Sequence, residues 1–168
     1  MRAEIISVGT ELLLGQIVDT NAVYLSQELA SLGIGLYRRS TVGDNPHRLR
    51  EAIEEALDRA ELVITSGGLG PTEDDLTKET VAQVLGLPLV LDQPSLDWIR
   101  TYFTKMGRKM TENNYKQALI PEGGKALVNP KGTAPGIAVK AKEKLVICLP
   151  GPPRELKPMF HDFVLPLL

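Results

Sequence analysis

The sequence contains a single cysteine, Cys148, so no disulfide can form within the chain. Cys148 lies in the apolar run LVICLP, residues 145–150, where a cysteine is expected to pack as a small core residue rather than act as a nucleophile. The lack of disulfides fits the reducing cytoplasm, and we expect a cytoplasmic protein.

Long apolar runs are also missing. The first residues, MRAEIISVG, are too short and too polar for a signal peptide. No apolar stretch approaches the roughly 20 residues that a membrane-spanning helix needs. We therefore do not expect the protein to associate with a membrane.

Neither sign of charge dominates the sequence. Nineteen basic and twenty-one acidic residues are well mixed and give a net charge of -2, which argues against a nucleic-acid-binding face. A chain of 168 residues can bury a core without disulfide or metal staples, so we expect one domain over residues 1–168. Its apolar end, FVLPLL, indicates either a domain cut from a longer protein or a natural end packed on the core.

Two familiar ligand-binding signatures are absent. No G-K-[ST] occurs, which excludes a P-loop, and Glu73 stands where the last glycine of a dinucleotide G-x-G-x-x-G would fall. His47 and His161 lack metal-ligand spacing, and we interpret both as structural or surface residues.

The first half of the chain alternates short apolar runs with helical periodicity. Strands are predicted over 4–8, 34–43 and 61–68, and helices over 20–33, 46–60 and 76–86. This order predicts an α/β fold: a mostly parallel sheet with helices on both faces.

The second half is less regular. A helix pair projecting from the sheet is predicted over 92–107 and 111–119, a strand over 125–130, a hairpin over 136–151 and a proline-interrupted helix over 152–168. We expect Trp98, Tyr102 and Phe103 to pack this helix pair rather than stack on a base. The loop NPKGTAPG, residues 129–136, is either a lid or a plain connector.

Three loops follow the three predicted parallel strands: residues 9–21, 43–46 and 66–77. Open α/β sheets bind ligands outside the carboxyl ends of their strands, so these loops predict a functional site at one edge. Gly9 and Thr10 of the first loop are expected to contact ligand, and Glu11 either contacts ligand or fixes its own loop. Asp19 and Asn21 either meet ribose hydroxyls or cap the following helix.

The third loop reads SGGLGPTEDDLT. Its glycines permit a close approach to backbone N–H groups, which favours a phosphate cradle over an ordinary tight turn. On this basis Gly68→Val should block a phosphate ligand and leave the fold intact. Asp75 is either a functional carboxylate or the N-cap of a helix that begins near Leu76.

Five segments together carry a family resemblance: SVGTELLLGQIVDTNA, TVGDNP, TSGGLGPTEDDLTKE, NPKGTAPG and LPGPPRELKPM. In this order, and over essentially the whole chain, they resemble the amino-terminal domain of the CinA (competence/damage-inducible) family, part of the molybdopterin-binding, MogA-like superfamily. The superfamily link rests on Gly67, Gly68, Gly70, Asp75 and Thr77, and on Pro150, Gly151 and Pro153.

The resemblance implies a three-layer α/β domain whose Gly-rich loop faces a phosphate-bearing ligand. In molybdopterin-handling relatives, the aspartates that match Asp44 and Asp75 are functional. In the CinA branch the domain is associated with divalent-metal-dependent hydrolysis of ADP-ribose at its pyrophosphate. Leu69, where the molybdopterin enzymes usually carry threonine, and Arg154 after Pro-Gly-Pro-Pro both favour the CinA branch.

Hydrolysis of ADP-ribose or a similar nucleotide diphosphate is therefore the activity we predict. Asp44 and Asp75 are the predicted catalytic residues, and Asp44, Asp74 and Asp75 are the predicted ligands of a divalent cation such as Mg, Mn or Co. The residues expected to bind phosphate or substrate are Gly9, Thr10, Asn21, Ser66, Gly67, Gly68, Gly70, Thr77, Gly151 and Arg154.

Two alternatives stay open: a molybdopterin-binding or nucleotidyl-transfer protein of molybdenum cofactor synthesis, and a non-catalytic nucleotide-binding module. The superfamily implies a homo-oligomer. Many CinA proteins carry a second, deamidase-like domain, which nothing in these 168 residues matches.

Overall fold

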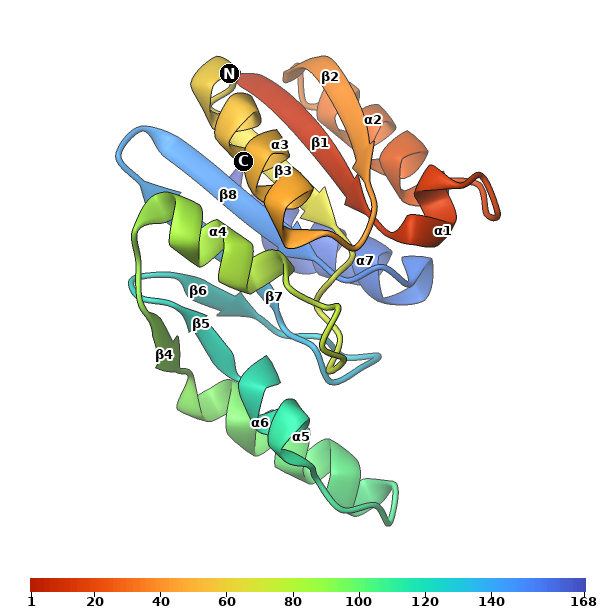
Figure 1. Cartoon of the computed structure of the whole chain (residues 1–168), viewed down its shortest axis with the longest axis vertical. Helices are drawn as coiled ribbons and strands as arrows, with labels where there is room; N and C mark the ends of the chain where they lie inside the picture. Colours follow the sequence, from red (N-terminus) through yellow and green to blue (C-terminus); the bar gives the residue numbers. More distant parts are fainter.

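A six-stranded sheet in the order β2-β1-β3-β8-β7-β6 forms the centre of the protein, in a computed structural model that describes all 168 residues (Figure 1). Its strands are β1 (Arg2–Val8), β2 (Gly35–Val42), β3 (Leu62–Ser66), β6 (Lys125–Leu127), β7 (Gly136–Ala141) and β8 (Lys144–Leu149). The pairs β1–β2, β1–β3 and β3–β8 are parallel, whereas β8–β7 and β7–β6 are antiparallel. The predicted α/β fold with a mostly parallel sheet is confirmed.

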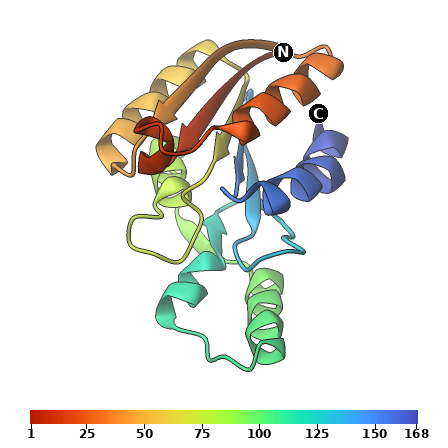
Figure 2. The same ribbon diagram turned by 90° about the vertical axis from the view of Figure 1, so that its right-hand side faces the viewer.

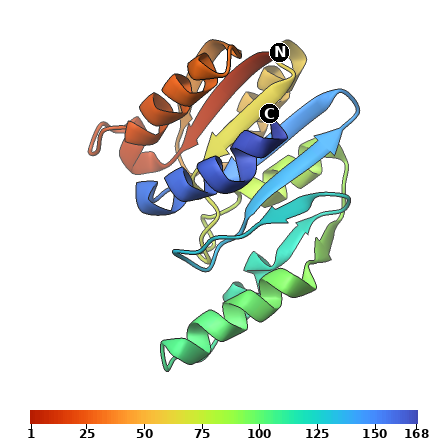
Figure 3. The ribbon, with the colours of Figure 1, turned by 180° about the vertical axis from the view of Figure 1, so that it is seen from behind.

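Helices cover both faces of the sheet because the central strands are apolar on both sides. Ile5, Ile64 and Ile147 are neighbours in register and share a core with α2 (Thr20–Ser31) and α7 (Pro153–Met159). Figure 3 shows these two helices on this face of the sheet.

The alternate positions of the same strands point to the opposite face, since successive side chains of a strand alternate. Ile6, Val63 and Val146 pack there with α3 (Pro46–Arg59) and α4 (Thr77–Leu85). The three-layer arrangement expected from the sequence is thus confirmed.

The carboxy-terminal helix changes its winding after α7. It continues as a π-helical turn over Phe160–Val164 and a 3-10 turn over Leu165–Leu167, and Pro158 lies inside the last turn of α7. Because proline cannot donate a backbone hydrogen bond, an irregular helix was expected here.

An arm, defined as residues 89–121, extends beyond the sheet (Figures 1 and 2). It contains the helices α5 (Gln93–Lys105) and α6 (Glu112–Gln117), which confirms the predicted helix pair. The arm is joined to the body by a two-stranded antiparallel ribbon of β4 (Leu89–Leu91) and β5 (Leu119–Pro121), which was not predicted. Residue 119 therefore belongs to a strand rather than to the second helix.

A short helix, α1 (Thr10–Leu13), follows β1 where only a loop was expected. None of the helices is both long enough and apolar enough to cross a bilayer.

Candidate functional site

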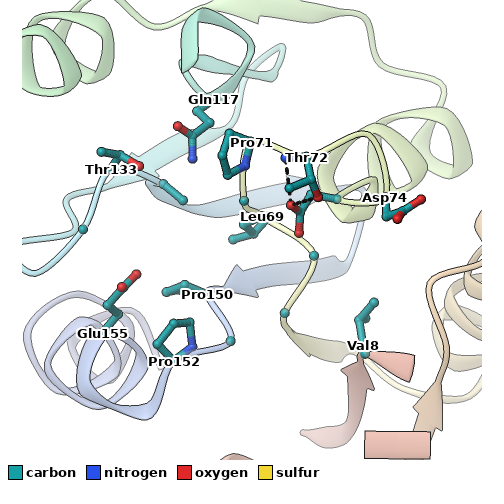
Figure 4. Close-up of a pocket in the computed structure, with 18 of the residues that line it drawn as sticks. Val8, Leu69, Pro71, Thr72, Asp74, Gln117, Thr133, Pro150, Pro152 and Glu155 are labelled. Carbon is teal, nitrogen blue, oxygen red and sulfur yellow. Dashed lines mark hydrogen bonds between the residues drawn. The ribbon is translucent and has the colours of Figure 1, made fainter. Parts of the chain in front are cut away.

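A cavity of about 540 Å³ opens at the carboxyl edge of the parallel strands (Figure 4). Loops after β1, β2, β3 and β8 contribute to its wall, so the predicted convergence of loops is confirmed and extended by a fourth loop. Of the residues predicted as functional, the cavity is lined by Gly9, Asp44, Gly67, Gly68, Gly70, Asp74, Asp75, Gly151 and Arg154.

The Gly-rich loop lines this cavity and contains unpaired backbone donors. The Gly67 N–H donates to the Leu149 carbonyl at 2.9 Å, but the N–H groups of Gly68, Leu69 and Gly70 have no acceptor within the protein. The Leu69 side chain is buried in the core, which fixes the backbone around it. Successive free N–H groups of this kind form an anion-binding concavity.

The glycines are also required by the fold itself. Gly67 and Gly68 have φ values of +105° and +69°, and a Cβ on Gly68 would collide with Oγ1 of Thr77. A Cβ on Gly67 would collide with the Val8 carbonyl oxygen. The expectation that Gly68→Val would leave the fold intact is therefore wrong, because the loop packs tightly against its neighbours.

Thr77 holds the Gly-rich loop in place. It is fully buried, its hydroxyl donates to the Gly67 carbonyl at 2.9 Å, and its N–H donates to the Gly68 carbonyl at 3.1 Å. Thr77 lines neither of the two cavities at this edge, and its contacts in the structure position the loop, so its contact with ligand stays a prediction.

The acidic turn after the glycines is organised by Asp75. Its Oδ2 accepts hydrogen bonds from the Thr72 N–H at 3.0 Å and from the Thr72 hydroxyl at 2.5 Å (Figure 4). The N-cap of α4 is Leu76, with no side-chain cap, so the alternative that Asp75 caps this helix is wrong. The half-buried Asp75 carboxylate lines the cavity instead.

Asp44 reaches the same cavity from the loop after β2. The Thr10 N–H donates to Asp44 Oδ2 at 3.1 Å, and the Asp44 N–H donates to Thr10 Oγ1 at 3.0 Å. This reciprocal pair joins the loops after β1 and β2. Thr10 itself does not line the cavity, so it serves to hold Asp44 there.

Asn21 and Ser66 lie beside the main cavity rather than in it. They line a second cavity of about 290 Å³ that shares Gly151 with the first. Asn21 Nδ2 donates to Ser66 Oγ at 3.0 Å and to the Gly151 carbonyl at 2.6 Å. Asp19 caps α2 by accepting from the Ala22 N–H at 2.9 Å, which confirms the capping interpretation.

The opposite wall comes from the second half of the chain, and only its loop 129–136 had been considered, as a lid or a connector, in the sequence analysis. It includes Tyr102, Gln117, Lys131, Thr133 and Glu155. Trp98 and Phe103 pack the arm as predicted, whereas Tyr102 lines the cavity. No local spacing marks these residues, because they come from separate elements.

The loop 129–136 is anchored as part of this wall. Asn129 Nδ2 donates to Glu155 Oε2 at 2.8 Å and to the Ala134 carbonyl at 2.9 Å, and Asn129 Oδ1 accepts from the Lys131 N–H at 3.1 Å. Asn129 is 1% exposed and Glu155 9%, so this network is buried. The loop therefore joins α7 to the rim of the cavity.

Acidic groups outnumber basic groups around the cavity. Its wall contains five carboxylates and two cationic groups, an excess of three negative charges when all are ionised: Glu11, Asp44, Asp74, Asp75 and Glu155 against Lys131 and Arg154. A phosphate ligand is repelled by such a wall unless a cation accompanies it.

The predicted metal ligands do not form a ready-made site. Nowhere in the structure do three His, Cys, Asp or Glu side chains lie close enough together to hold a metal ion. Asp44, Asp74 and Asp75 therefore do not form such a cluster. Magnesium, however, is commonly held by one or two carboxylates together with substrate phosphates and water. Asp44 and Asp75, which both line the cavity, stay the predicted ligands of such a cation.

Comparison with known proteins places this geometry in a family. Residues 4–168 match the family model described as "Probable molybdopterin binding domain". A curated competence-damage inducible protein of Acetivibrio thermocellus is 56% identical over 168 residues, which are 100% of this chain and 41% of that protein. A relative of the same name from Caldicellulosiruptor saccharolyticus is 58% identical over 168 residues, which again are 100% of this chain and 41% of that protein. The chain thus spans about two fifths of the length of these curated relatives.

Solved structures extend the comparison to the fold. The CinA protein of Thermoplasma acidophilum, described as of unknown function, has a TM-score of 0.91 and 36% identity, covering 99% of this chain and 98% of that one. The molybdopterin biosynthesis enzyme MoaB of Thermus thermophilus has a TM-score of 0.67 at 22% identity, covering 99% of this chain and 91% of that one. The second likeness concerns the fold alone.

Proposed function

This chain belongs to the molybdopterin-binding domain family and, within it, to the CinA group, and from that premise we propose that its cavity binds a phosphate-bearing small molecule of the pterin or nucleotide class. The observation that carries the proposal is the run of free N–H groups at Gly68, Leu69 and Gly70 inside the cavity. The volume of the cavity, about 540 Å³, lies in the range of small-molecule sites, about 300–1,000 Å³.

Phosphate binding here needs a cation. The excess of carboxylates over cationic side chains opposes a free anion, and we propose that Asp44 and Asp75, which line the cavity, hold a divalent ion together with the phosphate. Arg154 adds a positive charge from the first turn of α7 and takes part in none of the ion pairs of the structure. We propose that it contacts the phosphate directly.

A second candidate function is hydrolysis of a nucleotide diphosphate such as ADP-ribose. The observation that favours it is that two carboxylates, Asp44 and Asp75, reach the cavity from the loops after β2 and β3. A divalent ion bound there would neutralise charge on the phosphoryl oxygens. The free N–H groups would orient the diphosphate, and Asp44 keeps its second carboxylate oxygen free of protein donors, available to a water.

Calorimetric titration of the purified domain with molybdopterin, AMP and ADP-ribose tests the proposal, each with magnesium and then with chelator. We expect binding with magnesium and much weaker binding with chelator. No binding of any of the three ligands would refute the proposed function. Release of AMP and ribose 5-phosphate in the ADP-ribose sample would establish the second candidate.

Matched charge variants locate the phosphate. Arg154→Gln should weaken binding about tenfold, since a charge-assisted hydrogen bond is lost. Lys109→Gln removes the same charge from an exposed position of the arm outside the cavity and should leave affinity unchanged. Equal ligand affinities of the two variants would show that the phosphate does not contact Arg154. The homo-oligomeric state implied by the family stays a prediction, to be checked by light scattering.

A further inference from the structure

Gln117 ends α6 and reaches the cavity from the arm. Its side chain is buried, at 3% exposure, although it lines the cavity. Figure 4 shows its side chain between Thr133 and Pro71, with the amide nitrogen directed towards the middle of the pocket. The side chain thus reaches the cavity wall while Nε2 itself is enclosed, so a ligand meets Nε2 when neighbouring side chains of the wall shift slightly.

A short chain of hydrogen bonds fixes the orientation of this amide. Gln117 Oε1 accepts from Asn114 Nδ2 at 3.2 Å. Asn114 Oδ1 in turn accepts from the Thr111 N–H at 3.0 Å and from the Thr111 hydroxyl at 2.9 Å. Because Asn114 is committed as an acceptor at Oδ1, its amide nitrogen must face Gln117, and Gln117 must present its oxygen in return.

The consequence is a free donor inside the protein. Gln117 Nε2 is buried and has no hydrogen-bond partner. Buried donors are nearly always satisfied, and an exception requires an explanation. A buried donor without an acceptor lowers the stability of the folded protein. Such a cost is tolerated at a functional site, where a ligand can supply the missing acceptor.

The surroundings of Gln117 differ from those of the phosphate loop. The charged groups of the cavity lie on the loops after the strands and near α7, whereas the arm contributes the neutral side chains of Tyr102 and Gln117. An aromatic ring and a single neutral donor suit a flat heterocycle with a hydrogen-bond acceptor rather than a second phosphate.

We propose that Gln117 Nε2 donates a hydrogen bond to a ring acceptor of the ligand's heterocycle, while the phosphate lies at Gly68–Gly70. This inference rests on the proposed function and adds a specificity-determining residue to it. Pterins and adenine both offer ring nitrogens as acceptors, so the same chemistry serves either ligand. The arm then recognises the heterocycle of the ligand, and the loop that contains Gly68–Gly70 binds its phosphate.

Gln117→Glu is the sharpest test, since it keeps the oxygen that Asn114 needs and replaces only the free amino group. Titrations with magnesium compare ADP-ribose, molybdopterin and inorganic pyrophosphate, which has no heterocycle. We expect affinity for at least one heterocyclic ligand to fall about tenfold or more and pyrophosphate affinity to stay unchanged. Gln83→Glu, the same change at an exposed position outside the cavity, should affect none of the three.

Gln117→Met provides a second variant of similar shape without any charge, in case the buried carboxylate disturbs folding. It should show the same selective loss. The heterocyclic ligand whose affinity falls identifies the class that this wall recognises.

Two results would overturn the inference and leave the proposed function intact: unchanged affinity for all three ligands, or an equal loss for pyrophosphate and both heterocyclic ligands. The first would mean that no ligand meets Nε2, and the second that Gln117 only shapes the cavity. Failure of the unmodified domain to bind any of the ligands would instead refute the proposed function, and this inference with it.

Discussion

Asp75→Asn separates a binding site from a hydrolytic one. The substitution keeps the size of the side chain and removes one negative charge from the cavity wall. Its amide oxygen can still accept from the Thr72 N–H and hydroxyl, which the carboxylate now bonds at 3.0 Å and 2.5 Å. The acidic turn should therefore keep its shape.

The expected loss of stability is small. Hydrogen bonds to a charged acceptor contribute about 1.5–3 kcal/mol and neutral ones about 0.5–1.5 kcal/mol. Because Asp75 is only half-buried, we expect the free energy of unfolding to fall by about 1 kcal/mol at most. Denaturant titration of both proteins measures this difference.

The expected loss of function is much larger if Asp75 takes part in hydrolysis. Removing one electrostatic element of a transition-state site lowers turnover about 10²-fold or more. ADP-ribose affinity should fall only modestly, since the backbone N–H groups of Gly68, Leu69 and Gly70 are unchanged. Formation of AMP from ADP-ribose, with magnesium and with chelator, is the assay.

Glu73→Gln is the control, because it removes the same charge from an exposed residue of the same turn that does not line the cavity. Normal turnover by Asp75→Asn, or loss of turnover by Glu73→Gln as well, would refute the role given to Asp75. An unmodified domain that binds ADP-ribose without cleaving it would leave the binding function standing.

Three further predictions concern the fold. Gly68→Val should lower the free energy of unfolding by at least about 1–3 kcal/mol, because φ is +69° and a Cβ would collide with Thr77; thermal denaturation measures it, and an unchanged Tm would contradict it. Phe160→Ala should lower stability by about 3–5 kcal/mol, since the ring is fully buried against Tyr24 at 5.8 Å, and a loss under 1 kcal/mol would contradict this packing. Burial raises the pKa of Cys148 from 9.0 to about 11, so a thiol reagent at pH 8 should modify it only on unfolding. Modification of the folded protein by the reagent would contradict the burial of this thiol. Between the two pKa values the thiol of the unfolded chain loses its proton first, so the free energy of unfolding should fall as the pH rises from about 9 to about 11.

The local pattern of the chain predicted its regular elements well. Apolar runs and helical periodicity placed the first three strands and the helices between them, and parallel order then put the loops with Gly9, Asp44 and Gly67 at one edge. These features are predictable because periodicity reports which face of an element is buried, and chain order restricts how strands connect.

Pairing and close packing were decided only in three dimensions. The β4–β5 ribbon joins Leu89–Leu91 to Leu119–Pro121, two three-residue strands too short to leave a pattern in the sequence. The glycines of the Gly-rich loop raised the expectation of a ligand, whereas the contact of Gly68 with Thr77 became visible only in the folded chain. Likewise, a buried amide such as Gln117 can be recognised as an unpaired donor only when all its neighbours are in place. The sequence by itself determined the longer helices and strands and the edge at which their loops gather. The tertiary structure determined which side chains meet there, because those contacts join residues that are distant along the chain and share no periodicity.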